Sequence, residues 1–216
     1  MADAGWHVEP LSHKTLESLA ECHIRCFPGY FLTNCGPRLV ALFYEDFLES
    51  PIAMGFVAID HATGMVVGFV TGNTDGPAYR QWSLWRQRGL RAKLLVGRLF
   101  CSIRLWGQVL LRAVRAAGSV LTRLAGKGGA GGLDPRDAKA RLLSIGVLPE
   151  MRGSGVAAAL IEQFENACRA RGETRVGLSV FADNSRAIRF YEKSGWTRLE
   201  GLGPGVRFVK ELTPKS

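Results

Sequence analysis

The sequence predicts a mixed α/β fold, and two observations lead to this expectation. First, residues 142–147 form a short apolar run typical of a buried strand, a helical pattern follows over about 155–171, and apolar residues alternate over 176–180. A strand–helix–strand unit of this kind makes two parallel strands with a right-handed crossover. Second, residues 54–71 and 196–212 each have the pattern of an antiparallel hairpin. Together they predict a mixed β-sheet flanked by helices.

The segments before the central unit predict two helices and a hairpin. Apolar residues recur at three- and four-residue spacing over 12–27 and 36–48, with Pro28-Gly29 and Pro37 between the two runs. The strand-like runs 54–59 and 65–71 follow, joined by a turn-forming stretch. We therefore expect two entry helices and then an antiparallel pair.

The segments after the central unit predict a helix and a second hairpin. Asp183 or Asn184 can cap a helix that runs to Lys193 and ends at Gly195. The runs 196–199 and 206–212 flank a Gly-Pro-Gly turn. This hairpin closes the predicted sheet.

Length and composition predict a single domain over residues 1–216, because 216 residues with 47% hydrophobic content can bury a sizeable core. The five cysteines are odd in number and scattered, so reduced thiols and a cytoplasmic location are expected. The first residues show no secretory signal. Cys22, His23 and Cys26 lie together, but no second cluster completes a tetrahedral set, so no metal site is predicted.

The turn between the central strand and its helix is rich in glycine. Gly153 and Gly155 allow consecutive backbone N–H groups to converge on an anion, and the following helix adds about half a positive charge at its N-terminus. The turn lacks the Gly-Lys-Ser/Thr of a P-loop and the three-glycine spacing of a dinucleotide fingerprint. Pyrophosphate is the anion that such a turn suits, although the glycines alone would also fit a plain tight turn.

Three stretches of this chain resemble the GNAT superfamily of acyl-CoA-dependent N-acyltransferases. Residues 152–157, Arg-Gly-Ser-Gly-Val-Ala, are similar to its Arg/Gln-x-x-Gly-x-Gly/Ala signature. Residues 143–150 resemble its central strand, and residues 183–196 resemble its final helix with a Gly-aromatic ending. The likeness covers residues 140–199 closely and the earlier elements loosely. It implies a GNAT-like sheet whose central parallel strands splay apart to form a cleft for coenzyme A.

The resemblance implies acetyl-CoA as the donor substrate and assigns residues to it. Ile145, Gly146 and Val147 would contact the pantetheine and acetyl group, and Asn184 would contact the coenzyme A arm. The pyrophosphate would be held by Arg152, Gly153, Ser154, Gly155, Val156 and Ala157.

Acetyl transfer needs a neutral amine, stabilisation of the carbonyl oxygen and a proton for the leaving thiolate. The Val147 N–H is a candidate oxyanion donor, since fixed dipoles aimed at developing charge are usually the largest catalytic term. Tyr191 matches the family tyrosine that protonates the sulfur, and a phenol with a pKa of about 10 suits that role. The general base stays open among Ser144, which could hold a water, Glu45, Asp46 and Glu49.

Residues 76–133 form a basic insertion relative to the family. They contain 11 Lys or Arg and no Asp or Glu, whereas the rest of the chain has 17 basic and 19 acidic residues. If 91–123 is one helix, its basic and apolar residues fall on opposite sides, although three glycines weaken it. No uncharged apolar run is long enough to span a bilayer.

Two interpretations of this insertion are equally favoured. Residues 91–124 could bind an anionic membrane surface, which would make the protein peripheral on a membrane. Alternatively, their apolar face packs on the domain or on a second subunit in a homodimer. Nucleic-acid binding is third, because basic and aromatic residues segregate by face rather than interleave.

We expect an N-acetyltransferase that acts on a primary amine. Residues 30–38 resemble a stretch in GNAT proteins with similar insertions and links to polysaccharide or lipid-linked sugar pathways, which makes an amino sugar or a membrane-proximal small molecule the first expectation. The alternatives are acetylation of a protein N-terminus or lysine, and a non-catalytic acyl-CoA-binding membrane adaptor.

Overall fold

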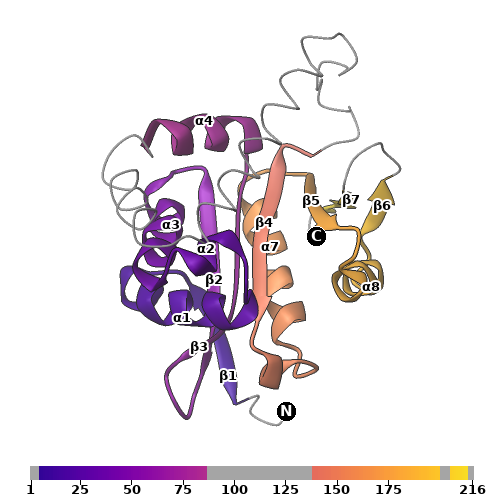
Figure 1. The fold of residues 1–216 in the computed structure, drawn as a ribbon. Coiled ribbons are helices and arrows are strands. Elements are labelled where there is room, and N and C mark those ends of the chain that lie inside the picture. Colours follow the sequence, from indigo (N-terminus) through magenta and orange to yellow (C-terminus); the bar gives the residue numbers. More distant parts are fainter. Residues whose placement is uncertain (1–4, 87–137, 200–204, 214–216) are drawn as a thin grey trace.

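The computed structural model describes residues 5–86, 138–199 and 205–213, whose elements form one β-sheet with helices on both faces (Figure 1). The predicted mixed α/β fold is confirmed. The strands are β1 (Trp6–Pro10), β2 (Ala53–Asp60), β3 (Val66–Asn73), β4 (Ala140–Val147), β5 (Arg175–Phe181), β6 (Thr197–Leu199) and β7 (Gly205–Glu211). The α-helices are α1 (Leu16–Cys26), α2 (Phe31–Asn34), α3 (Pro37–Glu49), α4 (Gly76–Arg86), α7 (Val156–Ala170) and α8 (Ser185–Lys193), and short 3-10 turns η1 (His13–Thr15) and η2 (Pro149–Met151) precede α1 and α7.

The described strands have the order β1-β2-β3-β4-β5-β7-β6. Among them β4 and β5 pair in parallel, and each other neighbouring pair is antiparallel. The two predicted hairpins are present as β2–β3 and β6–β7. Strand β3 runs two residues further than its apolar pattern indicates, to Asn73.

Strand β1 has no counterpart among the predicted elements. It lies at the sheet edge and pairs with β2 from Trp6 opposite Asp60 to Pro10 opposite Phe56. Proline is tolerated at the end of such a strand because an edge position needs fewer ladder hydrogen bonds. The first described element of the chain is therefore a strand of the sheet, and α1 follows it.

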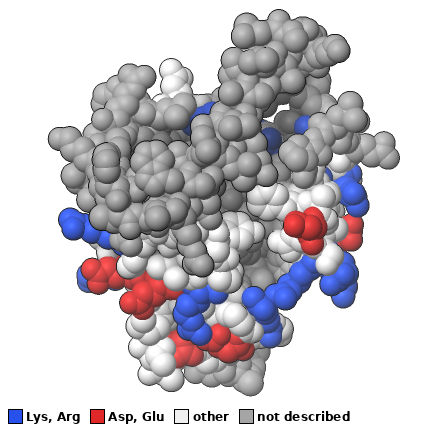
Figure 2. Space-filling view, in the orientation of Figure 1, with Lys and Arg blue, Asp and Glu red and all other residues white. Residues whose placement is uncertain are grey.

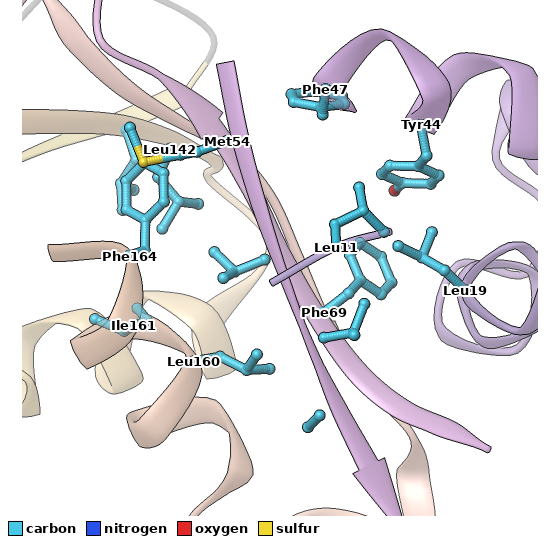
Figure 3. Packing of buried hydrophobic residues seen from close by; sticks show 14 of the residues in the cluster. Leu11, Leu19, Tyr44, Phe47, Met54, Phe69, Leu142, Leu160, Ile161 and Phe164 are labelled. Carbon is cyan, nitrogen blue, oxygen red and sulfur yellow. The ribbon is translucent and has the colours of Figure 1, made fainter. Parts of the chain in front are cut away.

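Side chains from both faces of the sheet build the core (Figure 3). Phe69 of β3 points toward α1 and α3, where Leu19 and Tyr44 are fully buried. On the other face Leu160 and Phe164 of α7, both 0% exposed, lie against the sheet. Burying a side chain of this size contributes about 1.5–3 kcal/mol, so the two apolar faces together fix the helices on the sheet.

A β-bulge interrupts the pairing of β3 with β4. Thr71 pairs with Ser144 but Gly72 pairs with Leu142, which leaves Leu143 without a partner in the register and 48% exposed. Leu142 therefore points toward α7, while Ser144 points toward Tyr44 of α3. Bulges re-aim side chains in this way and are frequent beside active sites.

A buried histidine joins α1 to α3. His23 is 6% exposed, and its Nδ1 lies 2.8 Å from the hydroxyl oxygen of Tyr44, which is 0% exposed. The imidazole also packs against Phe27 and Phe69, with ring centroids 4.9 and 6.0 Å away. Burial lowers the pKa of His23 to about 4, so the ring is neutral near pH 7.

We expect His23 to make the fold sensitive to acid. Between the ordinary pKa of about 6.5 and the folded value of about 4, the unfolded chain binds the proton more tightly, so stability falls as pH falls through this window. The loss attributable to His23 amounts to about 3 kcal/mol by pH 4. Urea unfolding of wild type and His23→Gln at pH 7 and pH 4 measures it.

The His23→Gln variant should be less stable at pH 7 but should lose less stability on acidification. His13→Gln, which removes an exposed histidine, is the control and should follow the wild type. Equal acid sensitivity of wild type and His23→Gln would contradict the assignment.

Candidate functional site

Strands β4 and β5 are paired only where they begin. The parallel register consists of Ala140 opposite Val176 and Arg141 opposite Gly177. Beyond these residues β4 continues beside β3 up to Val147, and β5 continues beside β7. The two strands therefore leave a gap in the sheet toward their carboxyl ends, where ligands of open α/β sheets bind.

The register of β3 and β4 determines which peptide groups face this gap. Leu148 N–H donates to the Val67 carbonyl at 2.9 Å, so Val147 and Gly68 face each other as a non-hydrogen-bonded pair. The N–H and C=O groups of Val147, and two residues earlier those of Ile145, consequently point away from β3 and toward the gap. Both residues were predicted from the sequence to contact a ligand.

Gly146 differs from its two neighbours because its peptide groups face β3. A side chain on this residue would collide with Phe69, since an added Cβ would lie 2.8 Å from the ring. The same position would be 3.2 Å from the Cβ of Cys26 on α1. Glycine is therefore required here for close packing of α1 on β4.

The predicted anion-binding turn lies directly after β4. Gly153 and Gly155 have φ values of +85° and +89°, a region that favours glycine, and Gly155 is the N-cap of α7. The amides of Arg152 and Ser154 donate to Pro149 and Met151, each at 3.3 Å. Within the described chain, the remaining amides of the predicted set, those of Gly153, Gly155, Val156 and Ala157, have no acceptor.

The charges around the turn favour an anion. The first turn of α7 has no acidic residue, so the positive end of its dipole is not neutralised. Arg152 is exposed beside it. Nearby Arg25 pairs with Glu150 at 2.6 Å, and hydrogen bonds from its own amide and from Arg25 hold the pKa of Glu150 below its usual range. Elsewhere the described surface in Figure 2 intersperses basic and acidic side chains.

Tyr191 lies on the other side of the gap, on α8. It is 3% exposed, and its ring packs against Phe190, Trp196 and Phe208 with centroids 5.4–5.8 Å away. Burial raises the pKa of the phenol, so the hydroxyl stays protonated and can donate a proton. At the start of the same helix the side chain of Asn184 accepts a hydrogen bond from Ala187 N–H at 3.1 Å, which confirms the predicted cap.

A chain of polar side chains reaches β4 from the interior. Ser144 Oγ lies 3.5 Å from the Tyr44 hydroxyl, which contacts His23. The sequence prediction included Ser144 but missed Tyr44 and the role of His23. A tyrosine on the apolar face of a helix is the signal for such a chain, because a buried hydroxyl usually finds a hydrogen-bond partner.

The three acidic candidates for a general base differ in exposure. Asp46 is fully buried, Glu45 is partly exposed and Glu49 is exposed on α3. The described residues contain no group of three or more His, Cys, Asp or Glu that could hold a metal ion. The described cysteines Cys22, Cys26, Cys35 and Cys168 are free thiols.

The described part of the basic insertion begins with helix α4. Residues 91–124 lie outside the described residues, so their predicted contact with a membrane or with protein is not seen in the structure. The insertion leaves and rejoins the sheet at one place, because Gly76 N–H donates to the Lys139 carbonyl at 3.0 Å. In the described part of the chain, no helix has the length and apolar character to cross a membrane.

Known proteins share parts of this sequence and the α/β fold described above. Residues 115–196 match the sequence model of the Acetyltransferase (GNAT) family, a range that includes the turn and Tyr191. The crystal structure of SsHAT superposes with a TM-score of 0.62 at 22% identity, covering 97% of this chain and 99% of that one.

Two further structures share the fold and contain coenzyme A. PaiA N-acetyltransferase from Thermoplasma acidophilum has a TM-score of 0.57 at 13% identity and covers 95% of this chain and 98% of its own. Aminoglycoside N-acetyltransferase AAC(6')-Iy has a TM-score of 0.58 at 14% identity, with 92% and 91% covered. Residues 115–196 of this chain are thus similar to the GNAT acetyltransferase family, and the chain shares the fold of these solved acetyltransferases.

Proposed function

We propose that the protein transfers an acetyl group from acetyl-CoA to a primary amine. The observation that carries the proposal is the coincidence of the β4–β5 gap with the turn at its end, where four backbone amides lack an acceptor within the described chain. An extended thiol arm with a pyrophosphate at one end suits such a site. The two similar structures in complex with coenzyme A support this choice of donor.

The donor substrate would be held mainly by backbone groups. The amides of Gly153, Gly155, Val156 and Ala157 would bind the pyrophosphate, with Arg152 adding positive charge and Ser154 closing the turn through its 2.7 Å bond to the Met151 carbonyl. Ile145 and Val147 would offer peptide groups to the amides of the pantetheine arm. Asn184 uses its side-chain oxygen as the cap of α8, which leaves its amide nitrogen for the arm.

The chemistry would take place between β4 and α8. The amine nitrogen attacks the thioester carbonyl, and the Val147 N–H would stabilise the negative charge on the oxygen. As the carbon–sulfur bond breaks, Tyr191 would give its proton to the thiolate. A phenol whose pKa is raised by burial remains available for this at neutral pH.

For the proton of the amine, Ser144 is the candidate that the contacts favour. Ser144 is partly exposed, and its Oγ lies 3.5 Å from the Tyr44 hydroxyl on the inner side of the strand. Ser144 would hold the amine or a water that accepts its proton.

The acceptor class is proposed as a small-molecule amine, with an amino sugar as the first example. The sequence of residues 30–38 motivates this choice. An insertion on the acceptor side would also obstruct the extended groove that a peptide acceptor needs. Acetylation assays by mass spectrometry with aminoglycosides, hexosamines, polyamines and peptide N-termini distinguish these classes.

An acidic residue in the first turn of α7 should weaken donor binding without weakening the helix. In Ala157→Glu the new carboxylate stabilises the helix N-terminus but repels a bound pyrophosphate. We expect the Kd for acetyl-CoA to rise about tenfold or more in calorimetric titration, since even about 1.4 kcal/mol corresponds to tenfold.

Gln163→Glu is the matched control, because it makes the same charge change at an exposed position further along α7. Its affinity should stay within about twofold of wild type. Equal affinities of all three proteins would place the pyrophosphate elsewhere, and lack of acetyl-CoA binding by the folded wild type would refute the proposed function.

Tyr191→Phe should separate an enzyme from an acyl-CoA sensor. Removing the proton donor should lower kcat by about 10²-fold or more, the usual contribution of general acid–base catalysis, while the Kd for acetyl-CoA changes little. Unchanged turnover in Tyr191→Phe would remove Tyr191 from the mechanism.

Membrane association through residues 91–124 stays a prediction. The whole chain should co-sediment with vesicles containing anionic lipid and should do so less at high salt, since each Lys or Arg near the surface contributes about 1 kcal/mol. A variant in which residues 87–137 are replaced by a short Gly-Ser linker should not co-sediment with these vesicles. Equal partitioning of the two proteins would reject the prediction.

A further inference from the structure

The gap between β4 and β5 divides the sheet into two halves. Strands β1 to β4 lie on one side of it, and β5, β7 and β6 lie on the other. The proposed anion-binding turn belongs to the first half and Tyr191 on α8 to the second. If the chain is an acetyltransferase as proposed, the reaction depends on how firmly the two halves are held relative to each other.

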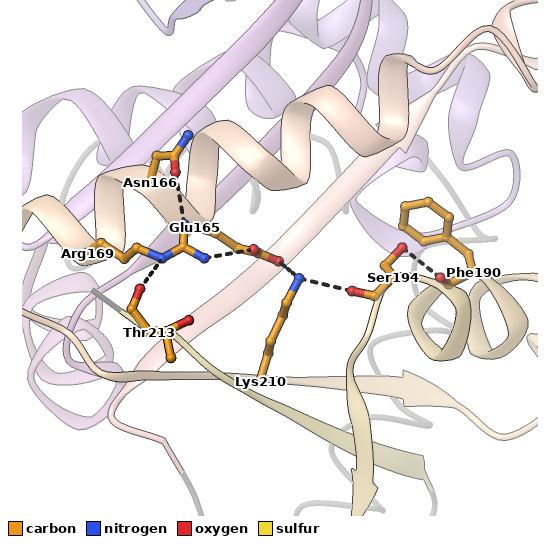
Figure 4. A network of polar contacts seen from close by, with 7 residues as sticks. All are labelled: Glu165, Asn166, Arg169, Phe190, Ser194, Lys210 and Thr213. Atoms are coloured by element: carbon orange, nitrogen blue, oxygen red, sulfur yellow. Dashed lines mark hydrogen bonds and ion pairs between the residues drawn. The ribbon is translucent and has the colours of Figure 1, made fainter. Parts of the chain in front are cut away.

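A buried ion pair connects the halves (Figure 4). Glu165 lies on α7, the helix that begins at the turn, and its side chain is 5% exposed. Its Oε1 lies 2.8 Å from Nζ of Lys210 on β7. Arg169, one turn further along α7, lies 3.5 Å from the other carboxylate oxygen and donates to the Thr213 carbonyl at 3.1 Å.

Lys210 also holds the end of α8. The same Nζ donates to the Ser194 carbonyl at 2.9 Å, and Ser194 is the C-cap of that helix. A cation at this end also interacts favourably with the helix dipole. Ser194 in turn donates from its backbone N–H to the Phe190 and Tyr191 carbonyls, each at 3.0 Å. The contact with Lys210 is thus one hydrogen bond away from the backbone of Tyr191.

The carboxylate of this cluster is buried, whereas the side chains of Lys210 and Arg169 are 23% and 20% exposed. Exposed ion pairs are screened and weak, whereas a charge as buried as Glu165 requires its partners to stay in place. Arg175–Glu211, an ion pair at 2.6 Å between the paired strands β5 and β7, lies within one half and offers a comparison.

We propose that Lys210 and Glu165 are positioning residues that set the separation of the two halves at the acyl-CoA gap and hold Tyr191 at the reacting sulfur. This inference rests on the proposed function. A displacement of a catalytic group by about 1 Å can lower the rate by about 10²-fold, so a contact that fixes α8 can control turnover without touching the substrate.

The test uses Lys210→Met, which removes the charge but keeps most of the side-chain length, and Lys210→Arg, which keeps the charge. Arg175→Met is the control, since it removes a cation from an ion pair that does not cross the gap. Hydrogen exchange of the α8 amides is measured first, because it does not depend on activity. Faster exchange of residues 185–193 is expected in Lys210→Met alone, and unchanged exchange there would overturn the proposal.

Kinetics then test the link to Tyr191. Lys210→Met should lower kcat about tenfold or more, Lys210→Arg should restore most of it, and adding Lys210→Met to Tyr191→Phe should cause little further loss. Full additivity of the two losses would overturn the positioning role. If the wild type binds no acetyl-CoA, the proposed function fails, and the exchange data still decide whether the contact holds α8.

Discussion

The early end of the pairing between β4 and β5 is the constraint on which the rest of the molecule depends. Two residues of parallel register align the strands, and the next residues give up ladder hydrogen bonds that a continuous sheet would keep. Unpaired peptide groups are costly when buried, so such a gap persists only where water or a substrate satisfies them. The strand edge of β4 therefore offers backbone hydrogen-bonding groups toward the gap, and this property does not require polar side chains.

The two sides of this gap are supported by different means. On the side of β4, apolar packing of α1, α3 and α7 encloses the strand, and the bulge at Leu143 turns Ser144 toward the interior chain of Tyr44 and His23. On the side of β5, α8 rests on an aromatic cluster around Tyr191 and on a buried charge. The β5 side of the gap therefore combines aromatic packing with a few polar contacts.

Much of the fold could be predicted from the sequence because its central elements are strongly periodic. The apolar face of α7, including Leu160 and Phe164, is buried as expected, and Asn184 caps α8. Strand β1 was missed because five residues with only Trp6 and Val8 in alternation give a weak signal, and its pairing with β2 is a long-range contact. The bulge and the Lys210–Glu165 contact also depend on register and packing between distant segments, which no local pattern specifies.

The two ends of the insertion meet the sheet at neighbouring points. Gly76 and Lys139 are hydrogen-bonded to each other, and Asn73 is the register partner of Arg141, so the segment leaves and returns at neighbouring points of one hairpin-like junction. The entropy of closing a loop rises only logarithmically with its length, by about 0.6 kcal/mol for each doubling. A change in the length of the segment between these two points therefore costs little in loop-closure entropy, so insertions of different length are compatible with the same β3–β4 pairing.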